Sequence, residues 1–197
     1  MPRNRFVILS VVEINWERLY GMFTAPVIEG DCSVLCAHEN RGVPPCCSIR
    51  RHVPMLFKEE FAWLMKKTRM WSPKRALFSN HHAIMFCACK GVRECDRHYR
   101  SLSCRFFPFE PYMDDRGRFL GATWMYSVEK TCPLVGSAPE KVNQAFIDQF
   151  VRVWTKLFLV YHEEYEFYRA ESRKLREAFA RIDRNVQVFT PSLSRAR

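Results

Sequence analysis

The sequence contains no apolar run near the roughly 20 residues that a membrane-spanning helix requires. The best candidate, Phe6 to Ile14, is too short and includes Glu13. There is no glycine-rich phosphate loop, no Gly-x-Gly-x-Gly pattern for a methyl donor, and no Cys-x3-Cys-x2-Cys pattern of the kind found in radical enzymes. Internal repeats and low-complexity segments are also missing. These absences argue against a membrane protein and against the common nucleotide-binding and radical-enzyme families.

An export signal is not expected either. Arg3 and Arg5 precede the apolar run, but residues 15–18 (Asn-Trp-Glu-Arg) follow it where a small-residue cleavage site would stand. What the chain does have is nine cysteines in 197 residues, an odd number and bunched rather than spread. This usage favours metal thiolates in a reducing compartment over disulfides, so we expect a cytoplasmic protein.

Positive charge is concentrated around the cysteines. Residues 41–105 hold 14 Lys and Arg against four acids, which accounts for the whole formal charge of +10. A four-thiolate metal site carries net negative charge, so basic neighbours would compensate it and lower the thiol pKa. The alternative is a nucleic-acid patch, but no nucleic-acid motif accompanies the charge.

Hydrophobic periodicity predicts an α+β, loop-rich chain. Residues 56–71 are expected to be helical, and residues 105–128 to form a β-hairpin that turns at residues 114–117. Residues 31–54 and 72–105 are expected to be irregular segments that bring cysteines together from several directions.

The C-terminal third predicts one long helical pattern. Ser137-Ala138-Pro139-Glu140 resembles a capping box, and a bend is expected near Arg169. We therefore divide the chain into a cysteine-cluster metal-binding domain (1–136), a helical segment (137–189) and a flexible tail (190–197). The helical segment is expected to pack on the domain or to project toward a protein partner.

The cysteines fall into two groups and a single residue. The first group is Cys32-x3-Cys36-x9-Cys46-Cys47, the second is Cys87-x-Cys89-x5-Cys95-x8-Cys104, and Cys132 stands alone. Thiolates select zinc or iron–sulfur clusters. Zinc ribbons usually present two Cys-x2-Cys pairs and this sequence has none, whereas iron–sulfur ligation accepts wider spacing. The spacing favours a 4Fe–4S cluster, with zinc as the alternative.

The stretch Cys-Asp-Arg-His-Tyr-Arg-Ser-Leu-Ser-Cys-Arg-Phe-Phe-Pro resembles the YkgJ-type cysteine-cluster family, whose domains are described as chelating zinc or iron. The positions that match the family's aromatic, arginine, Cys-Arg and proline places are Tyr99, Arg100, Cys104, Arg105 and Pro108. Cys132-Pro133 is similar to the family's final Cys-Pro. Ser101 stands where the family often has proline, and the nine residues between Cys36 and Cys46 exceed the family spacing. The resemblance covers about residues 31–136.

The resemblance implies a pool of eight metal ligands: Cys32, Cys36, Cys46, Cys47, Cys89, Cys95, Cys104 and Cys132. Cys87 follows an apolar run and is expected to be a buried spectator, although Cys87 and Cys89 could exchange roles. Spacing leaves open whether the eight form one site or two. Arg105 is a candidate cofactor-binding residue that would hydrogen-bond to sulfur or bind an anionic substrate; an ion pair with Glu110 or Asp96 is the alternative.

Three functions follow from these features. The first is a metal-binding protein, preferably with a 4Fe–4S cluster, in a redox, sensing or structural role. The second is an enzyme or accessory subunit for protein modification, because the same domain type occurs in flagellin lysine N-methylase. The third is a zinc-stabilised nucleic-acid-binding module.

Overall fold

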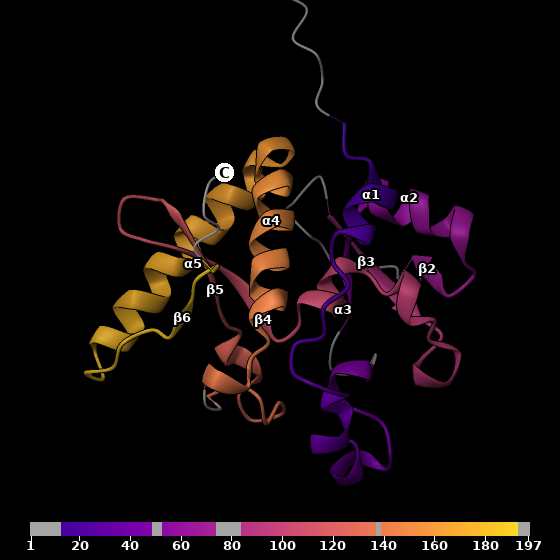
Figure 1. Ribbon diagram of the computed structural model, residues 1–197, viewed down its shortest axis with the longest axis horizontal. Coiled ribbons are helices and arrows are strands. Elements are labelled where there is room, and N and C mark those ends of the chain that lie inside the picture. The colour runs from indigo at the N-terminus through magenta and orange to yellow at the C-terminus, as the bar shows by residue number, and fades with distance from the viewer. Residues whose placement is uncertain (1–12, 49–52, 74–83, 137–138, 193–197) are drawn as a thin grey trace, which may run out of the picture.

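The computed structural model describes residues 13–48, 53–73, 84–136 and 139–192 (Figure 1). In this part of the chain, helices combine with two small antiparallel sheets, so the predicted α+β class is confirmed. None of the helices in these ranges is both long enough and apolar enough to cross a bilayer.

The first sheet was not predicted. Its order is β1 (Met55–Phe57), β3 (Ile84–Cys89) and β2 (Trp71–Pro73), with β3 in the middle. β3 lies in the segment expected to be irregular, and β1 and β2 take the ends of the range expected to be helical. The helix α2 therefore covers only Lys58–Lys67. Local periodicity could not reveal the strands, because strands this short are stabilised by partners distant in sequence.

The second sheet contains the predicted hairpin. β4 (Phe109–Met113) pairs with β5 (Phe119–Trp124), which confirms the hairpin, and β6 (Val188–Phe189) adds a third strand from the C-terminal segment. Gly121 permits this addition, because a Cβ atom there would lie 2.0 Å from the carbonyl oxygen of Phe189.

The C-terminal third forms two helices, α4 (Gln144–Val160) and α5 (His162–Ala180). The break lies at Tyr161 rather than near Arg169; its ring stacks on Phe57 at 4.3 Å and its hydroxyl donates to Glu59. The predicted capping box is wrong as the start of α4, because the side chain of Asn143 caps the helix by accepting from the N–H of Ala145. Ser137 and Ala138 lie outside the described residues, and Pro139–Lys141 forms a separate 3-10 turn.

Both C-terminal helices pack on the rest of the protein (Figure 1). α4 and α5 lie against the β4–β5 hairpin, and the ring of Phe146 contacts Phe23 and Phe109. The hydrophobic core runs without interruption from α1 (Trp16–Gly21) through α2 and α3 (Leu102–Phe106) to α4. The predicted tail is tied down at its beginning, since Ser192 donates its N–H to Asp148 on α4 at 2.7 Å.

The segment that carries the first cysteine group consists of short 3-10 turns. They are η1 (Cys32–Leu35), η2 (His38–Asn40) and η3 (Pro45–Cys47). Each turn redirects the backbone within three or four residues, which is how one short segment presents thiols in different directions.

Candidate metal centre

Five of the nine cysteines line one cavity. Its volume is about 350 Å³, and the thiols come from η3, β3, the residue after η4 (Val92–Glu94), and α3. The five are Cys46, Cys47, Cys89, Cys95 and Cys104. Apolar side chains, including Met55, Trp71 and Phe107, form much of the remaining wall, and Arg100 contributes a positive charge.

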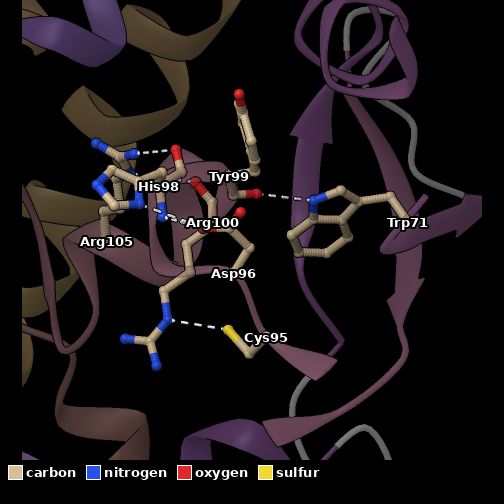
Figure 2. A network of polar contacts seen from close by, with 7 residues as sticks. All are labelled: Trp71, Cys95, Asp96, His98, Tyr99, Arg100 and Arg105. Carbon is tan, nitrogen blue, oxygen red and sulfur yellow. Dashed lines mark hydrogen bonds and ion pairs between the residues drawn. The ribbon is translucent and has the colours of Figure 1, made fainter. Parts of the chain in front are cut away.

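Local capping interactions hold the second cysteine group in place. Ser101 is the N-cap residue of α3, and its hydroxyl accepts from the N–H of Cys104 at 3.3 Å. Asp96 caps the preceding turn, η5 (Arg97–Tyr99), where its side chain accepts from the N–H of His98. The indole N–H of Trp71 donates to the carbonyl of Tyr99 at 2.9 Å and ties η5 to the first sheet (Figure 2). Cys95 and Cys104 are thereby fixed on either side of Arg100.

Arg100 bonds directly to a thiol. Its Nε donates to the Sγ of Cys95 at 3.2 Å (Figure 2). Its charge also acts on Cys47 and Cys104, so the guanidinium lies among three of the five sulfurs. The sequence matched Arg100 to a family position but did not select it as a site residue; its place between two nearby cysteines was the available signal.

Arg105 is used differently from the prediction. Its guanidinium donates to four carbonyl oxygens, those of Arg100, Tyr20, Phe23 and His98, at 3.2, 3.3, 2.6 and 2.6 Å. It also covers the ring of Tyr20 at 4.4 Å. The hydrogen bond to sulfur comes from Arg100 instead, and Arg105 joins η5 to the end of α1 behind the cavity.

The cysteines divide into an inner and an outer group according to which of them act on one another's thiol pKa. Besides burial, the charges of Cys95 and Cys47 raise the pKa of Cys89, and those of Cys89 and Cys47 raise the pKa of Cys104, so these four form the inner group. The pKa of Cys46 is raised by Cys47 and also by the charges of Cys32 and Cys36. The outer group is therefore Cys32, Cys36 and Cys46, with Cys132 near Cys32.

Protonation differs sharply between the adjacent cysteines. A hydrogen bond from the Cys46 thiol, helped by Arg100 and Arg97, lowers the pKa of Cys47 to about 6. The same hydrogen bond, together with burial, raises the pKa of Cys46. Burial raises the pKa of Cys104 to about 12. Cys47 is thus a thiolate at neutral pH, and a metal bound to Cys104 would displace its proton.

The remaining predicted ligands lie further out. Cys32 lines a second cavity together with Cys46 and Cys104, whereas Cys36 and Cys132 line neither cavity. All nine cysteines are reduced thiols. Within residues 13–48, 53–73, 84–136 and 139–192, no three His, Cys, Asp or Glu side chains already surround one ion position.

Cys87 is fully buried and does not line the cavity. Burial and the carboxylate of Glu60 raise its pKa to about 12. Its backbone N–H donates to Pro54 at 3.0 Å, so its place in β3 is set by the sheet.

Glu60 is a buried acid behind the site that the sequence analysis did not select. It accepts from the hydroxyl of Tyr20 at 2.5 Å, from the N–H of Leu102 at 2.7 Å and from the N–H of Phe57 at 3.2 Å. It therefore joins α1, β1 and the first residue of α3. Its position at the third residue of α2 was a helix-start signal, but nothing in the sequence indicated burial.

Comparison with family models, curated proteins and solved structures finds no match to this chain. Membership of the YkgJ-type family therefore stays a prediction.

Proposed function

We propose that this chain is an iron–sulfur protein that holds a 4Fe–4S cluster on Cys47, Cys89, Cys95 and Cys104. The observation that carries the proposal is the convergence of these thiols, from four separate segments, on one cavity of about 350 Å³. Four thiolates are the usual ligand set of such a cluster, so the donor chemistry fits.

The cavity favours a cluster over a single ion. Zinc bound tetrahedrally at about 2.3 Å from each sulfur holds the sulfurs only about 3.8 Å apart and leaves no space between them. Here the four cysteines line an open volume of about 350 Å³, which exceeds what one tetrahedral ion needs. A larger group that meets each thiol at its own corner suits this arrangement.

Arginines provide the charge that such a site needs. A 4Fe–4S cluster with four thiolates is anionic, and Arg100 donates to the sulfur of Cys95 from within the cavity wall. Arg97 and Arg100 both stabilise the Cys47 thiolate. This supports charge compensation as the role of at least part of the basic segment, rather than a nucleic-acid patch.

A cluster bound by these four cysteines would have a chemical and a structural consequence. A bound cluster would supply one-electron transfer. The thiols would join η3, β3, the turn before η5, and α3, so metal binding would also stabilise the tertiary structure. Five cysteines around one cavity suit metal thiolates in a reducing compartment, and we propose the cytoplasm.

Analysis of iron and acid-labile sulfide in anaerobically purified protein tests this proposal. We expect equal amounts of both, in the proportion of one 4Fe–4S cluster per chain. Cys104→Ser should lose the cluster, whereas the matched control Cys36→Ser, which changes a cysteine that lines neither cavity, should keep it.

Two outcomes would change the conclusion. Zinc without sulfide would replace the proposal with a structural zinc site. Iron well above one cluster per chain, reduced by Cys36→Ser, would show that the outer cysteines also bind metal.

A further inference from the structure

A second cavity adjoins the proposed cluster site and has a different chemistry. Its volume is about 340 Å³, which lies in the range of small-molecule sites. Cys46, Arg100, Cys104 and Phe107 belong to the walls of both cavities, so the two spaces adjoin at these side chains.

One wall of the second cavity is apolar and held in place. It is the segment 23–28, which contains Phe23, Ala25, Pro26, Val27 and Ile28. The side chain of Gln149 on α4 accepts from the N–H groups of Thr24 and Ala25, each at 2.8 Å. The carbonyl of Val27 accepts from Asn143 at 2.8 Å. The backbone of this wall is thus preformed and has little freedom to collapse into the space.

Another part of the wall is cationic. It contains the guanidinium groups of Arg97, Arg100 and Arg105 and one carboxylate, Asp31. Asp31 is already engaged, since it accepts from the N–H of Ser33 at 3.0 Å and forms an ion pair with Arg97.

The three arginines differ in the donors they have left. Arg105 donates hydrogen bonds to four carbonyl oxygens. Arg97 uses one terminal nitrogen on Asp31. Arg100 uses Nε on Cys95, and both of its terminal nitrogens are without a partner in the described part of the chain. Arg100 is half-buried and Arg97 is exposed, and guanidinium donors without a protein partner are favourable positions for an anion.

We propose that the second cavity binds a small molecule with a carboxylate attached to an apolar body. The carboxylate pairs with the unused donors of Arg100 and Arg97, because the planar guanidinium matches the two oxygens of a carboxylate. The apolar body lies against segment 23–28. The ligand would therefore be held beside the sulfur-lined wall, without any of the inner cysteines having to bind it.

Benzoate is the test probe, and benzamide, which has the same shape without the charge, is its control. Binding of both is measured by calorimetry on anaerobically purified protein at low salt, and iron and sulfide are measured on the same samples. The variant is Arg97→Gln, because Arg97 lines only the second cavity. The matched control is Arg93→Gln, which removes one exposed arginine from the neighbouring turn outside both cavities.

We expect benzoate to bind the wild-type protein. Benzamide should bind at least about tenfold more weakly, which is the change expected for loss of a charge-assisted hydrogen bond. Arg97→Gln should weaken benzoate binding to a similar extent when it is compared with wild type in samples of equal iron and sulfide content, and Arg93→Gln should bind like wild type. Failure of benzoate to bind, or equal affinity for benzamide, would overturn the proposal, and this comparison needs no variant to fold. Benzoate binding by protein without iron and sulfide would instead refute the cluster and leave the carboxylate site standing.

Discussion

Replacement of Glu60 by glutamine should change the pH dependence of stability in a defined direction. Glu60 is completely buried, and burial raises its pKa from 4.5 to about 7. The three hydrogen bonds that its carboxylate accepts act in the opposite direction and lower the pKa. The folded chain therefore retains a proton at Glu60 over a pH range in which the unfolded chain has released it.

The sign follows from proton linkage. Because the pKa is higher in the folded state, the stabilisation from the protonated carboxyl is complete below about pH 4.5 and is lost as the pH rises through about 7. The loss is at most about 1.4 kcal/mol per pH unit, or about 3 kcal/mol over the whole window. Glutamine resembles the protonated acid in shape and cannot ionise.

Glu60→Gln should accordingly match wild type at about pH 4 and become more stable than wild type by up to about 3 kcal/mol at about pH 8. The measurement is the free energy of unfolding, or the shift in Tm, at several pH values on anaerobically purified protein. Glu129→Gln, an exposed charge removal that leaves Glu60 intact, should retain the wild-type pH profile. A Glu60→Gln protein that is less stable than wild type by the same amount at every pH would refute this prediction. The three hydrogen bonds would then outweigh burial in setting the pKa of Glu60.

Three further changes test other parts of the structure. Arg105→Lys should lower stability by about 2–3 kcal/mol, because one ammonium cannot reach carbonyls on both α1 and η5, and the exposed control Arg116→Lys should be neutral in thermal unfolding. Cys87→Ser should keep full metal content and cost about 1–2 kcal/mol for an imperfectly bonded buried hydroxyl; metal loss in this variant would place Cys87 among the ligands. Binding to generic duplex DNA should be weak and disappear at physiological salt in a fluorescence titration, whereas tight, steeply salt-dependent binding would favour the nucleic-acid alternative.

The sequence by itself determined the features that depend on local pattern. The two apolar arms on either side of the turn at residues 114–117 predict the β4–β5 hairpin. The three-to-four spacing of Phe146, Phe150, Val153 and Leu157 predicts a buried helix face, which α4 has. The concentration of cysteine and positive charge in one part of the chain is likewise a property of the sequence alone.

The tertiary structure decided which of these residues meet. Cys46 and Cys47 are neighbours in sequence, yet Cys47 belongs with Cys89, Cys95 and Cys104 while Cys46 also faces Cys32. Spacing along the chain cannot divide eight cysteines between sites, because the turns, the strand and the helix that carry the thiols are positioned by contacts with remote elements.

Tertiary contacts also determined which arginine bonds to sulfur and which acid is buried. Arg105 stands directly after a cysteine but reaches back to carbonyls of α1, and Arg100 takes the contact with sulfur. Glu60 looks like any acid at the start of a helix until Tyr20 and Leu102 enclose it. Burial and hydrogen-bond partners are set by segments that are 40 or more residues apart, and this is information that a local pattern does not contain.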